Sequence, residues 1–255
     1  MRRAVSLVAV VVAAGCGRGY ESTRGAAIVH FKIRSHEETL VEAAGGGRGR
    51  PLLVFLHGRG SRPDSNLTQP LFDTLRALGP RAPDVLLANG GDHAYFHDRK
   101  DRRWATEILR EAIPAALAHA HADPSRLAIG GISMGGFGAL DLARVAPGRF
   151  CAVGAHSAAL WFRARDTAPG AFDDAQDFAR HDLIRFAAER RLYRVPVWID
   201  VGRDDPVASA DEALARDLRA HGTRVTFHLH GGGHGGWRAR MPQYLGWYAA
   251  RLAAC

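Results

Sequence analysis

The hydroxyl of Ser133 is the side chain of this 255-residue sequence whose surroundings point most directly to chemistry. It is the centre of the pentapeptide GISMG, residues 131–135, which lies between an apolar run typical of a buried strand and a run with helical spacing. A strand-to-helix turn this sharp has no room for side chains two positions before or after the serine, and glycine removes them. The pattern predicts an exposed nucleophile, and a glycine-rich turn with an incidental serine is the alternative.

A serine hydroxyl is a weak nucleophile, so it needs a base within hydrogen-bond reach and an acid that orients this base. His234 is the candidate base, because it is the only non-glycine residue in the segment 231–236 and can lean over the serine unobstructed. The candidate acids, Asp204 and Asp205, follow an apolar run that we expect to be a strand. These residue types fit the serine, acid and histidine of nucleophilic acyl transfer.

Acyl transfer also needs N–H donors for the oxygen that becomes negative in the tetrahedral intermediate. We expect one donor to be the amide of Met134, which follows the serine. The other candidate is the amide of Arg59 in the segment Leu56-His57-Gly58-Arg59-Gly60, where the glycines would let the backbone approach that oxygen.

The elements around these residues alternate between strand and helix, which predicts a mostly parallel sheet with helices on both faces. The length suits a single domain, which we assign to residues 25–255, and the segment Ala158–Arg194 could add a small cap. The expected strands are Ala26–Ile33, Glu38–Ala43, Pro51–Leu56, Asp84–Ala88, Arg126–Gly130, Phe150–Ala155, Val195–Val201 and Val225–His230. The expected helices are Leu71–Leu78, Trp104–His119 with a kink at Pro114, one starting at Met134, and Ala208–His221.

Four motifs in order make the chain resemble the α/β-hydrolase superfamily, in particular the esterase D and antigen 85-like branch that also includes feruloyl esterases. They are GISMGGFGAL around Ser133, WATEILREAIP (Trp104–Pro114), DVGRDDPV (Asp200–Val207) and GGGHGGWRARMPQYLGWYAARL (Gly231–Leu252). The resemblance covers roughly residues 50–252 and implies the α/β-hydrolase fold. It also implies that the acid is the fourth residue of Gly-x-x-Asp, Asp205, with Asp204 as the alternative. An extra glycine between His234 and Trp237 departs from the His-x-Trp pattern of the branch.

The function that the resemblance and the triad favour is hydrolysis of a carboxylic ester, small or glycan-linked, through an acyl-enzyme. Acyl transfer to a sugar or lipid hydroxyl, as in antigen 85-like relatives, is one alternative, and a non-catalytic envelope binding protein on the same fold is another. The triad needs no cofactor and no metal. Two sets of residues have a spacing that could chelate a metal: His228 and His230 with His234, and His93 with His97 and Asp98. The 13 histidines of the chain produce such spacings by chance, however.

Candidate substrate contacts come from loops at the catalytic edge of the predicted sheet. His93 and Tyr95 lie in the segment after the expected strand Asp84–Ala88, and Trp161 lies in the possible cap. Trp237, close after the candidate base, is the fourth. Each of these side chains could equally be packed or hydrogen-bonded within the protein.

The N-terminus predicts export. Arg2-Arg3 precedes the apolar run Ala4–Ala14, which is too short to span a bilayer and suits a signal peptide. The run ends before Cys16 in a segment that resembles a bacterial lipobox, although Ala13 stands where leucine is usual. We therefore expect residues 1–16 to be a signal with a lipidated cysteine, residues 17–24 a tether, and the protein to be held on the membrane surface of the cell envelope. Secretion without lipid is the alternative.

The charge and the remaining cysteines complete the expectations. The net charge is +8 and the pI about 10.1, but the arginines are scattered among acids without a nucleic-acid-binding motif, so we expect no nucleic-acid partner. Export would permit a disulfide between Cys151 and Cys255. Two cysteines define no framework, however, and we expect a buried Cys151 and a free terminal Cys255.

Overall fold

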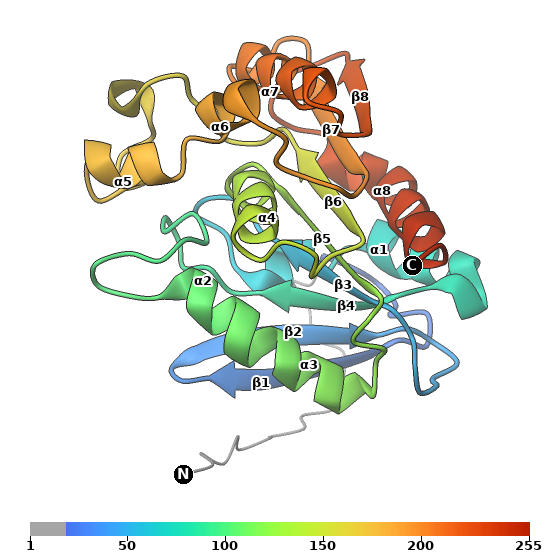
Figure 1. Ribbon diagram of the computed structural model, residues 1–255. Helices are drawn as coiled ribbons and strands as arrows, with labels where there is room; N and C mark the ends of the chain where they lie inside the picture. Colours follow the sequence, from blue (N-terminus) through green and yellow to red (C-terminus); the bar gives the residue numbers. More distant parts are fainter. Residues whose placement is uncertain (1–18) are drawn as a thin grey trace.

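The computed structural model describes residues 19–255, which form an eight-stranded sheet with helices on both faces (Figure 1). The strand order is β1-β2-β4-β3-β5-β6-β7-β8. The neighbours from β4 through β8 pair in parallel, whereas β2 is antiparallel to both β1 and β4. The predicted fold class, a mostly parallel sheet covered on both faces, is confirmed. The strands are β1 (Ala27–Ile33), β2 (His36–Glu42), β3 (Leu52–Leu56), β4 (Asp84–Ala88), β5 (Leu127–Ile132), β6 (Ala152–His156), β7 (Val197–Gly202) and β8 (Val225–His230).

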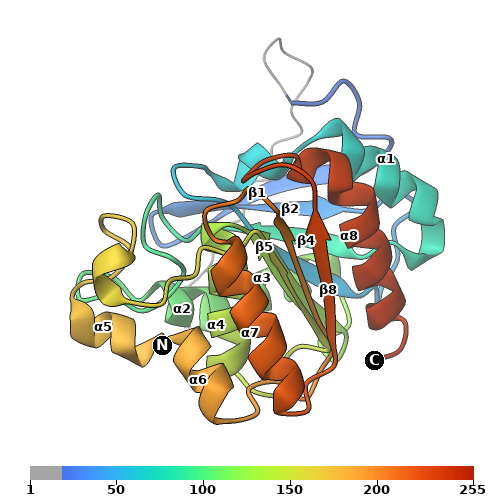
Figure 2. The same ribbon diagram turned by 90° about the horizontal axis from the view of Figure 1, so that it is seen from above.

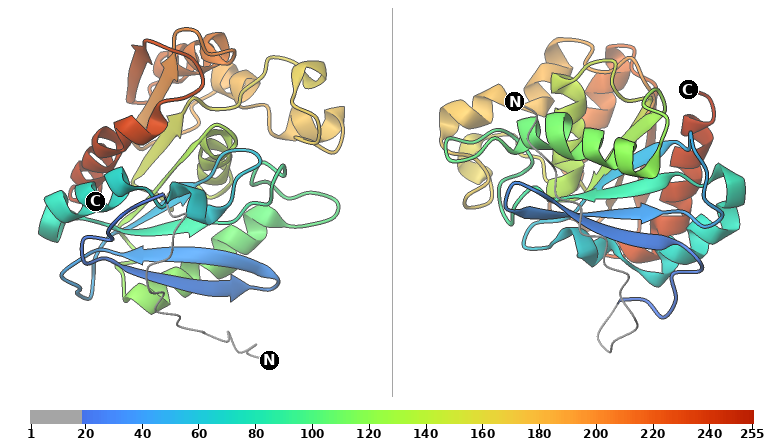
Figure 3. Two further views of the ribbon diagram at one scale, coloured as in Figure 1. Left: turned by 180° about the vertical axis from the view of Figure 1, so that it is seen from behind. Right: turned by 90° about the horizontal axis from the view of Figure 1, so that it is seen from below.

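Two apolar layers enclose the sheet (Figures 2 and 3). Helices α1 (Gln69–Leu78) and α8 (Trp237–Leu252) lie side by side on one face. The other face is covered by α4 (Met134–Val145), by α7 (Ala208–Ala220) and by the helical segment between β4 and β5. The central strands β3, β4, β5, β6 and β7 are buried along their whole length, as expected for parallel strands between helical layers. Their carboxyl ends therefore meet at one edge, where ligands bind in such sheets.

The helix expected at Trp104–His119 is helical throughout but changes its winding. It comprises α2 (Trp104–Glu107), a π-helical turn η3 (Ile108–Ala112) and α3 (Ile113–Ala120). Proline lacks an N–H and its ring clashes with the preceding turn, so the wider π turn just before Pro114 removes the conflict without a break. The predicted irregularity at Pro114 is confirmed as a change of winding.

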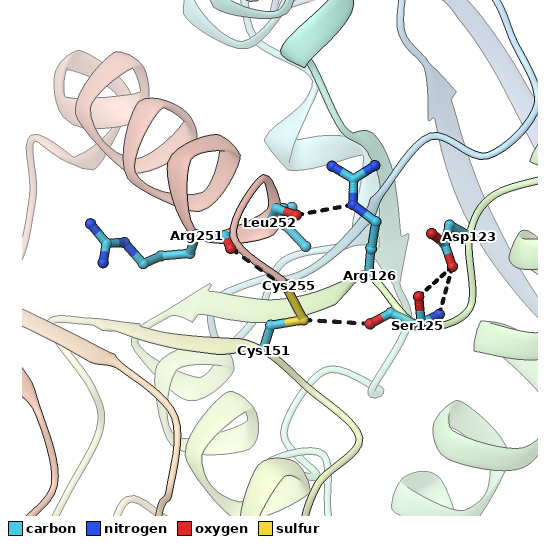
Figure 4. Close-up of a disulfide and its surroundings, with 7 residues drawn as sticks. All are labelled: Asp123, Ser125, Arg126, Cys151, Arg251, Leu252 and Cys255. Atoms are coloured by element: carbon cyan, nitrogen blue, oxygen red, sulfur yellow. Dashed lines mark hydrogen bonds between the residues drawn. A yellow bond between two sulfur atoms is a disulfide. The ribbon is translucent and has the colours of Figure 1, made fainter.

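The expectation that Cys151 and Cys255 are unpaired is wrong, because the two sulfur atoms form a disulfide (Figure 4). Helix α8 starts at the carboxyl edge of the sheet and runs back to the opposite edge, where β6 begins. There the Cα atoms of the two cysteines lie 6.0 Å apart. Arg126 supports the same junction by donating to the Leu252 carbonyl at 3.0 Å. The end of α8 is thus fixed to the amino edge of the sheet.

The possible cap is a folded segment that packs over α4 and carries α5 (Ala175–Arg180) and α6 (Leu183–Glu189) (Figure 1). Polar contacts that are buried or half-buried hold it in place. His97 Nε2 donates to the Asp177 carboxylate at 3.0 Å, Arg99 pairs with Asp173 at 2.8 Å, and His181 Nδ1 lies 2.8 Å from the Asp141 carboxylate on α4. The cap is therefore part of the same globular unit.

The predicted signal peptide, Cys16 and the first residues of the tether lie outside the described residues, so their assignment stays a prediction. Within residues 19–255, no helix combines the length and apolar character needed to cross a bilayer.

Candidate active site

Ser133 occupies a strained turn between β5 and α4. Its φ is 57° and its ψ is −114°, a conformation that a non-glycine residue adopts only when its surroundings enforce it. A Cβ added at Gly131 would lie 2.5 Å from the Gly135 carbonyl, and one at Gly135 would lie 2.3 Å from the Leu56 carbonyl oxygen. The flanking glycines are required by this close approach of backbones, as the sequence pattern predicts.

Three side chains from separate loops meet at the carboxyl edge of the sheet. His234, between β8 and α8, places Nε2 2.8 Å from the hydroxyl oxygen of Ser133. Its Nδ1 lies 2.9 and 3.1 Å from the two carboxylate oxygens of Asp205, which follows β7. The Asp205 side chain is fully buried and also accepts the amide of Val207 at 3.1 Å, whereas 43% of the His234 side chain is exposed. Asp204 is exposed, and its amide is bonded to the Gly232 carbonyl.

The loop after β3 passes beside this serine, because a Cβ at Gly58 would lie 3.9 Å from the Ser133 Cβ. His57 in this loop is buried, which lowers the pKa of its imidazole, and its Nε2 accepts the Gly90 amide while Nδ1 donates to the Gly58 carbonyl at 2.9 Å. The carbonyl and the next N–H of a trans peptide point in opposite directions, so this bond turns the Arg59 N–H away from His57. Among residues 19–255, the amides of Arg59 and Met134 donate to no acceptor.

Beneath Ser133 lies a buried polar network that the sequence patterns do not reveal. The Ser133 amide donates to the His156 carbonyl at 2.9 Å, and the His156 ring bonds to the Asp200 carboxylate and to the Tyr248 hydroxyl. Tyr244 adds a bond to Asp200 at 2.8 Å. Although burial acts to raise it, these partners hold the pKa of Asp200 below its ordinary value. The network joins β6 and β7 to α8 directly below the serine.

Two glycines make space for this network. A Cβ at position 130 or 154 would lie 1.8 or 1.7 Å from the Tyr248 hydroxyl, so both strands need glycine where the tyrosine enters. Gly130 and Gly154 lie opposite each other on neighbouring strands. This pair of glycines is the signal in the sequence that could have indicated a buried group at this place.

A second unpredicted group is the carboxyl of Asp211 on α7. It is completely buried; the Ala158 amide approaches it, but among residues 19–255 neither of its oxygens forms a hydrogen bond of normal geometry. Burial raises the pKa of Asp211 well above its ordinary value, and the charges of Asp205 and Asp200 raise it further. Its burial and the carboxylates of Asp205 and Asp200 therefore both favour the protonated form of Asp211.

The four candidate substrate residues have different environments. His93 is exposed, whereas Tyr95 is buried in an aromatic cluster with Phe137, Trp161 and Phe172. Burial raises the pKa of Tyr95 to about 12. Trp237 is half-buried at the first turn of α8, on the face of the sheet that α1 and α8 cover. Their contact with substrate stays a prediction.

The histidines suspected of metal binding have other contacts in the structure. His230 bonds to Arg240 and His228 packs against Trp198. His97 faces Asp177 and His181, and these three could approach a metal together. The oxygens of Asp177 already accept His97, the Asp173 amide and Arg180, however, which accounts for the cluster as the anchor of α5.

The fold and this edge define a class of protein. A serine on a strained turn after the fifth strand, a carboxylate after the seventh and a histidine after the eighth is the arrangement of α/β hydrolases.

The family follows from comparison of the whole chain with known proteins. The model of the Esterase family, described as "Putative esterase", matches residues 46–253, and the chain belongs to this family. Esterases MT1326 and Rv1288, from two strains of Mycobacterium tuberculosis, are 30% identical to the chain over 119 residues, which is 44% of this chain and 26% of theirs. The chain thus spans about a quarter of the length of these curated relatives.

Solved structures agree with the fold. A ferulic acid esterase superposes with a TM-score of 0.73 at 20% identity, covering 89% of this chain and 98% of that one. An S-formylglutathione hydrolase from Agrobacterium tumefaciens gives 0.71 at 18% identity, covering 91% and 98%. The fluorophosphonate-binding serine hydrolase F of Staphylococcus aureus gives 0.67 at 15% identity, covering 88% and 98%. The predicted resemblance is confirmed at the level of the Esterase family, and the chain shares the fold of these hydrolases.

Proposed function

We propose that the chain is a serine esterase that hydrolyses carboxylic esters through an acyl-enzyme. The observation that carries this proposal is the continuous hydrogen-bond chain from Ser133 through His234 to Asp205. Family membership and the fold of the esterase structures support it.

In the proposed reaction His234 Nε2 takes the proton of Ser133 as its oxygen attacks the ester carbonyl. Asp205 keeps the proton on Nδ1, so that Nε2 is free to accept, and stabilises the imidazolium that forms. The amides of Met134 and Arg59 would hold the oxyanion, since neither has an acceptor among the described residues. His234 then protonates the leaving alcohol, and water releases the acid by the same steps in reverse.

The substrate class that we propose is an ester with a short acyl group, small or glycan-linked. The cap offers only short helices, and the nearby Tyr95 ring already packs within the protein, so few acyl carbons could be covered. Each covered CH₂ adds about 0.8 kcal/mol, and affinity should stop rising after a few carbons. Acyl transfer to a sugar or lipid hydroxyl is the second candidate, because the same triad performs both reactions.

A fluorophosphonate probe tests the nucleophile directly. Wild-type protein should be labelled at Ser133, and Ser133→Ala and His234→Ala should lose esterase activity by about 10⁶ in kcat while remaining folded. Absence of labelling, or near-wild-type turnover in either folded variant, would refute the mechanism and favour a non-catalytic binding role. A nitrophenyl ester series with and without EDTA then measures chain-length preference. Highest kcat/KM at a long acyl chain would favour the lipid acyltransferase, and zinc-dependent activity would contradict the metal-free mechanism.

We further propose that the protein is exported and anchored through a lipid on Cys16. The apolar run Ala4–Ala14 before this cysteine supports the proposal. A lipid-anchored protein should sediment with membranes, and Cys16→Ser should release it or leave an uncleaved precursor, because anchoring depends on buried acyl carbons. A wild-type protein found only in the soluble extracellular fraction would contradict the anchor.

A further inference from the structure

A cavity of about 510 Å³ lies at the opposite edge of the sheet from Ser133. Its walls come from the loop between β2 and β3, the turn after α1, the residue before β5 and the end of α8. The amino ends of the parallel strands meet here, whereas the catalytic residues follow the carboxyl ends. The cavity is therefore separate from the proposed active site.

The lining of this cavity carries four arginines and no acidic residue: Arg48, Arg50, Arg81 and Arg126. None of the four forms an ion pair with a carboxylate among residues 19–255. The carboxylates behind the lining have other partners, because Asp84 accepts the Ala43 amide and Asp123 accepts Ser125. The charge of Asp84 still acts on Arg50 and that of Asp123 on Arg126. The four arginines nevertheless leave an excess of positive charge around the cavity, to which Arg48 and Arg81 contribute most, and this excess favours an anion.

Two of these arginines are fixed in place by carbonyl groups, which position a guanidinium without neutralising it. Arg50 donates to the carbonyls of Ala82 at 3.0 Å and Ala44 at 3.1 Å. Arg126 donates to Leu252, beside the disulfide that holds the end of α8 (Figure 4). Arg48 and Arg81 are exposed and form no side-chain hydrogen bond with a described residue, so they are available to a ligand.

The loop that carries Arg48 adds backbone donors. Gly46, Gly47 and Gly49 have positive φ angles of 39°, 151° and 79°, and a Cβ at any of them would meet nothing within 4 Å. Among residues 19–255, the amides of Gly47 and Arg48 donate to no acceptor. Arginine forks and free amides of a glycine-rich loop are the donors that bind phosphoryl oxygens.

We propose that this cavity, bounded by Arg48, Arg50, Arg81 and Arg126, binds the phosphoryl group of a phosphorylated ligand. Its volume is in the range of small-molecule sites and exceeds what a single phosphate fills. The phosphoryl group can belong to a free metabolite or to a lipid headgroup, and both present the same oxygens to the arginines.

Calorimetric titration with inorganic pyrophosphate in about 0.15 M NaCl, where non-specific charge attraction is screened, tests the proposal. The wild type should bind one pyrophosphate, and Arg48→Ala combined with Arg81→Ala should weaken binding by about tenfold or more for each arginine. Arg224→Ala removes an exposed arginine elsewhere and should bind as the wild type does. Hydrolysis of a small nitrophenyl ester should be unchanged in all variants.

Sedimentation with phosphatidylcholine vesicles, with and without phosphatidylglycerol, distinguishes the two sources of phosphate. Pyrophosphate binding without vesicle binding supports a free phosphorylated ligand. Vesicle binding that needs phosphatidylglycerol and is lost in the double arginine variant supports a headgroup. No binding of either probe, or binding that the double variant retains, overturns the proposal.

Discussion

Replacing Asp205 with asparagine tests the orientation of His234, and Asp204→Asn is the matched control one residue away. In the structure both Asp205 oxygens lie within 3.1 Å of His234 Nδ1 and the carboxylate is fully buried, whereas Asp204 is exposed. An asparagine can turn its NH₂ towards Nδ1, which then has to accept. The proton would move to Nε2, where it blocks acceptance of the Ser133 proton.

The expected cost follows from this change of tautomer. Comparable substitutions lower kcat by about 10⁴, which corresponds to about 5.5 kcal/mol of transition-state stabilisation. The assay is kcat/KM for a nitrophenyl acetate, with the melting temperature of each variant measured to show that it is folded. Asp204→Asn should stay within a few-fold of the wild type. A large loss in Asp204→Asn together with a small one in Asp205→Asn would refute the assignment and move the orienting role to Asp204.

Three further predictions concern the scaffold. Gly131→Ala should abolish activity or folding, because the added Cβ would lie 2.5 Å from the Gly135 carbonyl. Gly246→Ala is the control and should be tolerated, because its Cβ would meet open space. Equal activities of the two purified variants would contradict the strained turn. Cys151→Ser should lower the free energy of unfolding by about 2–5 kcal/mol because the disulfide closes a 104-residue separation, and an unchanged denaturation midpoint under non-reducing conditions would show that the bond does not form. The raised pKa of Asp211 makes the folded state bind a proton that the unfolded state releases above about pH 4, so this group destabilises the fold as pH rises towards its folded-state pKa. Across that pH window, the free energy of unfolding of Asp211→Asn should rise relative to the wild type by up to about 1.4 kcal/mol per pH unit. Glu212→Gln changes an exposed neighbour and should show no such rise. Parallel curves of unfolding free energy against pH for Asp211→Asn and the wild type would refute the raised pKa.

The elements that a short stretch of sequence determines could be predicted. The apolar runs of β3, β4 and β5 correspond to buried strands within a few residues, and the alternation in β1 corresponds to an edge strand. The role of the glycines in the segment 131–135 could be predicted, because a side chain at either position would clash with backbone close to the turn. The loops that carry Asp205 and His234 could be placed because parallel strands bring all their carboxyl ends to one edge.

What depends on distant elements could not be predicted. Asp200 and His156 lie within strands and resemble isolated polar residues until Tyr244 and Tyr248 are brought onto them from α8. The prediction of unpaired cysteines was wrong for the same reason, because their pairing depends on the length and direction of α8 and on no local pattern. The raised pKa of Asp211 likewise follows from its complete burial near Asp205, which composition does not indicate.

Helix α8 connects most of these unpredicted features. It begins three residues after His234, contacts the network beneath Ser133 through Tyr244 and Tyr248, and leads to the disulfide at Cys255. Because the carbonyl of His156 accepts the amide of Ser133, helix α8 supports the proposed nucleophile through this network as well as the loop of the proposed base. Hydrogen bonds and a covalent bond along one rigid element limit the relative movement of the proposed nucleophile and base more than the glycine-rich loop around His234 could by itself. A loop with so little side-chain packing can therefore position the proposed base, since α8 fixes where the loop ends.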